Sequence, residues 1–149
     1  MRSVGATPSR HLTVIAVDRR AQEDSRRFTF TDDAALRIEP AKPIDMTREA
    51  NGELSLVVEY RIDQPLSGAV TLAMEAGGRT RAVPVRRMLG ATPAGQWGSL
   101  AVPLQCFGGL DLARIDRPFE LSASGGGAIS ISDVRVDYVA TPMTRCGDE

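Results

Sequence analysis

Apolar residues occupy every second position from Leu54 to Ile62, which is the clearest pattern in the chain. The even-numbered positions are apolar, whereas the odd-numbered positions, ending with Arg61, are mostly polar. A period of two over this length predicts a β-strand that buries one face. Turn signals flank the strand at residues 50–52 and 63–68, where Asn, Gly and Pro gather.

Shorter stretches repeat this alternation and are joined by Gly/Pro-rich turns. Pro103 inside one stretch predicts an edge strand or a bulge. A change of parity at residues 132–133 predicts a β-bulge. Helical hints are confined to residues 20–26 and 110–115. About nine short strands predict an all-β antiparallel sandwich or barrel, with candidate strands at residues 13–17, 27–30, 35–38, 53–62, 70–74, 81–85, 100–104, from 117, and 129–138.

The length of 149 residues predicts one domain. We expect the sandwich at residues 12–140, between a flexible N-terminal segment (1–11) and a flexible tail (141–149). The formal net charge of −1 argues against a nucleic-acid partner. No apolar run reaches the roughly 20 residues of a membrane helix, and no signal peptide is recognisable. The chain is therefore cytoplasmic or a piece of a longer exported protein.

Two cysteines leave two readings open. Cys106 lies between Leu104 and Phe107, which predicts a buried thiol. Cys146 lies in the polar tail. A bridge between them would imply an oxidising compartment.

No catalytic apparatus is recognisable. His11, the only histidine, lies in the segment expected to be flexible, which excludes the common Ser-His-Asp and Cys-His mechanisms. The Gly125–Gly127 run is interpreted as a hairpin turn rather than a phosphate loop. Glu53 and Glu59 lie on the polar face of their strand, as solvated surface carboxylates do, and Glu49 precedes it. We therefore predict no catalytic residue.

Candidate binding residues are few. Trp97 lies at a turn before a strand, where it either stacks on a sugar ring or anchors one end of the sandwich. Glu49 and Asn51 are the other candidate carbohydrate contacts. Tyr60 and Tyr138 share the apolar parity of their strands, which predicts core positions.

Asp133 is an acidic residue at the predicted bulge of the last long strand. Its carboxylate either accepts backbone hydrogen bonds at the bulge or is one ligand of a structural Ca²⁺, because hard cations favour carboxylate oxygens. The sequence indicates no other cofactor.

Four segments, found in a fixed order, resemble the C-terminal galactose-binding-like domain of bacterial exo-acting β-glucosidases of glycoside hydrolase family 3. Asp18–Phe28 looks like the first segment of that family, and the resemblance covers roughly residues 15–139. The four segments are EANGELSLVVEYRID (residues 49–63), GQWGSLAVPLQCF (95–107), DLARIDRPFEL (111–121) and ISISDVRV (129–136).

The resemblance implies a jelly-roll sandwich related to carbohydrate-binding modules. It implies an exported, often periplasmic parent enzyme that removes glucose from β-glucans and carries its catalytic residues in preceding domains. Relatives often carry extra cysteines in the loop where this chain reads Glu75–Gly78, and this departure favours an unpaired Cys106.

Three roles follow as hypotheses. In the first, the domain docks on the catalytic domains of its parent and contacts β-glucan. In the second, it is an autonomous carbohydrate-binding module. In the third, it is a purely structural or dimerisation domain.

Overall fold

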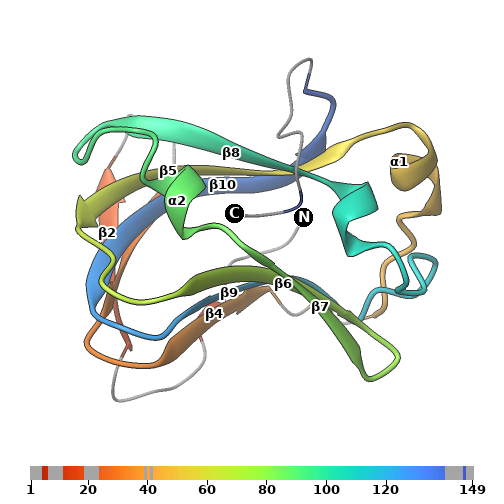
Figure 1. Ribbon diagram of the computed structural model, residues 1–149, viewed down its shortest axis with the longest axis horizontal. Coiled ribbons are helices and arrows are strands. Elements are labelled where there is room, and N and C mark those ends of the chain that lie inside the picture. The colour runs from red at the N-terminus through yellow and green to blue at the C-terminus, as the bar shows by residue number, and fades with distance from the viewer. Residues whose placement is uncertain are drawn as a thin grey trace.

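The structure is a computed structural model that describes residues 5–6, 12–18, 24–38, 40, 42–139 and 146. Two antiparallel five-stranded sheets face each other (Figure 1). The first sheet, sheet A, has the order β1 (Gly5–Ala6), β4 (Ala34–Ile38), β9 (Arg117–Ala123), β6 (Val70–Ala76) and β7 (Arg79–Pro84). The second, sheet B, has the order β2 (Leu12–Asp18), β3 (Asp24–Phe30), β10 (Gly127–Asp137), β5 (Ser55–Gln64) and β8 (Trp97–Pro103).

This architecture confirms the predicted all-β antiparallel sandwich. Its ten described strands exceed the expected nine by the two-residue β1. β1 lies within residues 1–11, the segment predicted to be flexible, and it pairs with β4. The rest of residues 1–11 lies outside the described residues, as does the tail 141–149 apart from Cys146, so the flexibility of both ends stays a prediction.

The core fills the space between the sheets. The even positions of β5, from Leu56 to Ile62, are buried, as their alternation predicts. The odd positions Ser55 and Val57 are buried too, so the prediction of one buried face holds only for the second half of the strand. Tyr60 is among the largest buried side chains, and its hydroxyl donates to the carbonyl of Leu89 at 2.9 Å. Leu89 ends the short helix α2 (Arg86–Leu89), so this hydrogen bond ties α2 to the core.

The helical hints were wrong. Residues 24–26 belong to β3, residues 20–23 lie outside the described part of the chain, and residues 110–115 form turns that end in a β-bridge at Ile115. Besides α2, the described part of the chain forms one short helix, α1 (Thr47–Asn51), and one 3₁₀ turn, η1 (Leu104–Phe107). Within the described residues, no helix has the length and apolar character needed to cross a membrane.

Two features of the strands follow the prediction. Pro103 ends β8, an edge strand of sheet B. The register of β10 against β5 shifts between Ile131 and Asp133, which is the predicted β-bulge and leaves Ser132 as the extra residue.

The Gly125–Gly127 run is not a hairpin turn, because it joins β9 of sheet A to β10 of sheet B. It runs beside the connection from β5 to β6, which likewise leads from one sheet to the other. The two connections touch at Gly68 and Gly125: a Cβ built on Gly125 would lie 2.7 Å from the backbone nitrogen of Gly68. Glycine is therefore required here by close approach of two backbones.

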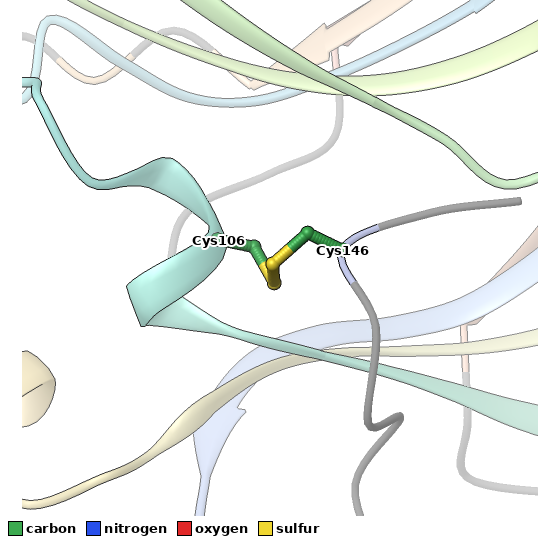
Figure 2. The surroundings of a disulfide bond; sticks show 2 residues. All are labelled: Cys106 and Cys146. Carbon is green, nitrogen blue, oxygen red and sulfur yellow. A yellow bond between two sulfur atoms is a disulfide. The ribbon is translucent and has the colours of Figure 1, made fainter.

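A disulfide joins Cys106, in η1, to Cys146 (Figure 2). The expectation of an unpaired Cys106 was therefore wrong. The Cα atoms are 5.3 Å apart, within the normal reach of a disulfide. Nothing in a sequence separation of 40 residues signals that proximity.

Candidate functional site

The solvent-facing side of sheet B carries the polar half of the strand alternation. On β5, Glu59, Arg61 and Asp63 point away from the core, because their even-numbered neighbours point into it. All three form ion pairs with other residues of this face. We call this surface the outer face of sheet B.

Four side chains of this face form one row across the strands. Trp97 on β8 lies opposite Arg61 on β5, Arg61 lies opposite Ser130 on β10, and Ser130 lies opposite Arg27 on β3. Side chains at directly opposite positions of neighbouring strands lie close enough to interact. The register therefore brings together residues that lie far apart in the sequence, and we call this set the Trp97–Arg27 row.

Asp63 sits at a second β-bulge. Gln64 pairs with Ala128 and Ile62 pairs with Ile129, so no residue of β10 lies directly opposite Asp63. Bulges redirect side chains and are common next to functional sites. The turn expected from Asp63 onward begins later, because β5 continues to Gln64.

The carboxylate of Asp63 connects the row. It accepts hydrogen bonds from Nε of Arg61 at 2.6 Å, from Nε of Arg27 at 3.0 Å, and from the hydroxyl of Ser130. Its side chain is only 10% exposed. One carboxylate thus orients two guanidinium groups, and charge-assisted bonds of this kind are stronger than neutral ones.

Trp97 is half-buried at one end of the row. The guanidinium carbon of Arg61 lies 5.1 Å from the centroid of its ring, which is cation–π geometry. Trp97 is thus neither a fully buried anchor nor an isolated aromatic platform. Its role in carbohydrate binding stays a prediction.

A depression of about 380 Å³ opens beside the row and is lined by Arg27, Thr29, Arg61, Asp63, Gln64, Gly95 and Ala128. Five of these seven residues carry polar side chains. Its volume lies near the lower end of the roughly 300–1,000 Å³ typical of small-molecule sites. Guanidinium, amide and hydroxyl groups around one hollow suit a ligand rich in hydroxyl groups. We call this hollow the Asp63 depression.

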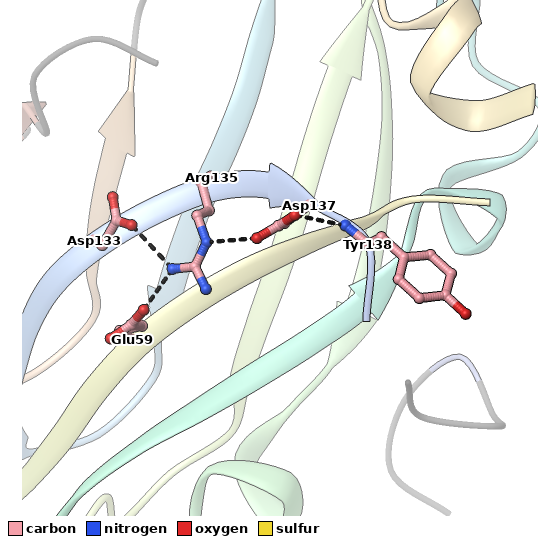
Figure 3. Close-up of polar contacts among 5 residues, drawn as sticks. All are labelled: Glu59, Asp133, Arg135, Asp137 and Tyr138. Atoms are coloured by element: carbon pink, nitrogen blue, oxygen red, sulfur yellow. Dashed lines mark hydrogen bonds and ion pairs between the residues drawn. The ribbon is translucent and has the colours of Figure 1, made fainter. Parts of the chain in front are cut away.

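A second polar cluster on the same face surrounds Arg135 (Figure 3). Its guanidinium contacts Glu59 at 2.5 Å, Asp133 at 2.9 Å and Asp137 at 3.2 Å. Burial alone would lower the pKa of Arg135, but the hydrogen bonds to these carboxylates raise it above its ordinary value. The ring of Tyr138 points away from the cluster.

Asp133 therefore has an arginine partner. Among the residues that the structure describes, no three histidine, cysteine or carboxylate groups gather as metal ligands would. The calcium hypothesis for Asp133 stays a prediction, which thermal unfolding with and without a chelator would test.

Tyr138 was predicted to lie in the core and is instead 66% exposed. It follows Asp137, the last residue of β10 and the last to pair with β5, so it lies past the end of the strand pair. Strand parity predicts burial only as far as a facing sheet continues.

Glu49 and Asn51 lie elsewhere. Both line a depression of about 640 Å³ along α1, together with Asp45, Thr47 and Arg48. In Figure 1, α1 lies at the end of the sandwich where β8 finishes, whereas Trp97 begins β8 at the other end. Seven strand residues span about 20 Å, so the structure does not bring the three predicted carbohydrate contacts together.

Sequence reasoning missed Arg27, Arg61, Asp63 and Ser130 as site residues. The polar parity of residues 53–62 already placed Arg61 on the outer face. For Asp63, the one available signal was its own position: it is a charged residue at the next odd position after Arg61, just past the expected end of the strand. The pairing partners on β3 and β10 had no local signal.

Comparison with known proteins gives the following similarities. The sequence model of the Exop_C family, described as galactose-binding domain-like, matches residues 2–136. The chain is similar to the extra C-terminal domain (X) of exo-1,3/1,4-beta-glucanase (ExoP) from a Pseudoalteromonas species, with 20% identity and a TM-score of 0.74 over 97% of this chain and 83% of that one. A larger structure of the same glucanase aligns with 93% of this chain, which spans 17% of that enzyme.

The family 30 carbohydrate-binding module of the cellulosomal cellulase Cel9D-Cel44B of Clostridium thermocellum is also similar. It shares 12% identity at a TM-score of 0.64, over 93% of this chain and 91% of the module. At these identities the solved structures establish a shared fold. No curated protein matched the sequence.

Proposed function

Because the chain belongs to the Exop_C family of galactose-binding domain-like domains, we propose that it is a non-catalytic C-terminal accessory domain of an exported β-glucan-degrading enzyme of glycoside hydrolase family 3. The observation that carries this proposal is the alignment of nearly the whole chain with the extra C-terminal domain of a glucanase. In this role the domain docks on the catalytic domains of its parent and contacts the β-glucan substrate.

The Cys106–Cys146 disulfide supports export. Structural disulfides persist in the periplasm and outside the cell and are rare in the reducing cytosol. This favours a periplasmic or secreted parent over the cytoplasmic alternative that the sequence left open.

The ion pairing of three partly buried carboxylates supports a non-catalytic role for them. A glycosidase needs two carboxyl groups about 5–10 Å apart across the scissile bond, one of them free to deliver a proton. In the described part of the chain, Glu59, Asp63 and Glu120 are all partly buried, and each accepts a hydrogen bond from an arginine. These are contacts of structural ion pairs.

The proposal is tested in two steps. The isolated chain is assayed on aryl β-glucosides, laminarin and cellodextrins, and we expect no hydrolysis. The parent enzyme is then compared with and without this domain, and deletion should weaken its action on polymeric glucan more than on an aryl glucoside. Hydrolysis by the isolated chain would contradict the proposal.

The Asp63 depression and the similarity to a carbohydrate-binding module favour a second candidate, an autonomous carbohydrate-binding module. This candidate predicts that the isolated domain binds glucan equally well alone and in the presence of a parent enzyme from which the domain has been deleted. It also predicts that the domain does not associate with that truncated parent. Co-elution of the two pieces in gel filtration would favour the docked accessory domain.

A further inference from the structure

We propose that the Asp63 depression, together with Trp97 beside it, is a glycan-binding site in which a short, neutral β-gluco-oligosaccharide lies across β8, β5, β10 and β3, from Trp97 at one end to Arg27 at the other. The choice of a β-glucan rests on the proposed function. The position of the site, its orientation and its preference for an uncharged sugar rest on the residues of this face.

The dimensions suit a few sugar units. The Trp97–Arg27 row crosses three strand-to-strand intervals, which amounts to about 14 Å. Together with a volume near 380 Å³, this accommodates roughly two or three pyranose rings in a shallow site of this size. Affinity should therefore rise from glucose to a trisaccharide and then level off.

The arginines are held in place before any ligand arrives. Arg27 and Arg61 each use Nε on the carboxylate of Asp63. A terminal nitrogen of Arg61 donates to Ser130 at 3.4 Å, while among the described residues the terminal nitrogens of Arg27 have no hydrogen-bond partner. A guanidinium fixed at Nε presents two parallel donors, and such preorganisation lowers the entropy cost of binding.

These donors match the hydroxyl oxygens of a sugar. Thr29 and Gln64, which also line the depression, add groups that both donate and accept. The exposed part of the Trp97 indole supplies apolar surface for the C–H groups of a pyranose ring, and Arg61 packs against that indole.

The charge of the face favours a neutral sugar over an acidic one. Arg27, Arg61 and Arg135 are balanced by four carboxylates: Asp63 in the depression and Glu59, Asp133 and Asp137 around Arg135. Over the whole face an anionic glycan would therefore meet no excess of positive charge. In the depression itself, Asp63 already occupies Nε of both arginines and would repel a second carboxylate.

The test is titration calorimetry of the 149-residue chain with glucose and with cello- and laminari-oligosaccharides of increasing length. Arg27→Ala and Trp97→Ala should each weaken binding about tenfold or more, since each removes a charged donor or an aromatic contact. Arg27→Lys keeps the charge but loses the paired donors, and should also weaken binding.

Arg135→Ala is the matched control. Arg135 and Arg27 are ion-paired arginines of the same face with the same side-chain exposure of 36%, but Arg135 does not line the depression. Its replacement should leave the affinity unchanged. Melting temperatures of all variants, measured alongside, identify any that fail to fold, and Arg27→Lys then stands in for Arg27→Ala.

Three results would overturn the inference: no heat with any neutral oligosaccharide, equal losses in the Arg27 and Arg135 variants, or binding only of uronate-containing oligosaccharides that weakens with added salt. These results bear on glucan contact alone. Docking on the parent enzyme is tested separately, by deletion of the domain and by co-elution of the two pieces. If deletion of the domain had no effect on the parent enzyme, oligosaccharide binding measured by calorimetry on the isolated chain would still be valid.

Discussion

Arg61 lies directly across the β5–β8 pair from Trp97, with its guanidinium carbon 5.1 Å from the centroid of the ring. The same guanidinium is anchored through Nε to Asp63. Trp97 is therefore held against the outer face of sheet B by a residue that is itself held by the carboxylate at the bulge. This chain of contacts links an aromatic edge residue to the Asp63 depression.

Trp97 is the single tryptophan, so the protein's tryptophan fluorescence reports on the surroundings of this one indole, which include Arg61. We expect Arg61→Leu to change the intensity and wavelength of the emission and to increase quenching by acrylamide, because the indole loses its cation. The contact itself contributes about 0.5–1 kcal/mol at a partly exposed site. Arg135→Leu on the same face should leave the spectrum unchanged, and identical spectra for wild type and Arg61→Leu would refute the stacking.

Removing the disulfide with Cys106→Ala/Cys146→Ala should lower the free energy of unfolding by about 3–4 kcal/mol, since the bridge closes a loop of 40 residues that restricts the unfolded chain. Urea unfolding with and without a reductant measures the effect. The reductant should destabilise the wild type and leave the double variant unaffected. A wild type insensitive to reductant would show that the bridge contributes nothing.

Gly125→Ala should destabilise the domain by about 1–3 kcal/mol, because the new methyl group would overlap the backbone of Gly68. The neighbouring Gly126→Ala is the control: the nearest atom to its Cβ would be the carbonyl oxygen of Phe30 at 3.5 Å, an ordinary contact. Its stability should change little. Equal melting temperatures of the two variants would contradict the close approach of the connections.

Burial raises the pKa of Tyr60, and the hydrogen bond with Thr92 offsets part of that rise. Because the folded state favours the neutral phenol, the stability from Tyr60 is complete below its unfolded pKa of about 10 and is lost as pH rises through the higher folded value. In a Tyr138→Phe background, which leaves one tyrosine, tyrosinate absorbance should titrate above pH 10 until the protein unfolds.

Tyr60→Phe should remove that alkaline loss. At neutral pH it should cost about 1–2 kcal/mol, because the buried carbonyl of Leu89 loses its donor. Denaturant unfolding of both proteins at neutral and alkaline pH gives the comparison. If Tyr60→Phe lost as much stability at alkaline pH as the wild type, the group responsible for that loss would be one other than Tyr60.

Local patterns predicted the parts of this structure that local forces determine. The alternation around Tyr60 located β5 and its buried face, Pro103 located an edge strand, and the parity change near Asp133 located a bulge. Each depends on residues a few positions apart, since strand geometry has a period of two.

The parts that sequence missed depend on pairing between distant segments. The row that joins Arg27 to Ser130 exists only because β3 lies beside β10. The disulfide, and the passage of Gly125 between sheets rather than round a hairpin, are also decided by strand order. Strand order depends on packing of the whole domain, so the candidate site could be recognised only once the strands were placed.

The proline that ends β8 limits how this domain can join other chains. The amide of Leu104 points toward β5 and donates to the carbonyl of Leu54. Backbone amides alternate in direction along a strand, so the nitrogen of the neighbouring Pro103 points away from β5, toward the open edge of the sheet. An incoming strand would find no donor there, and η1 follows at once. Pro103 therefore removes the outward donor at the end of β8, so a strand from another chain could pair only with the part of this edge that precedes it.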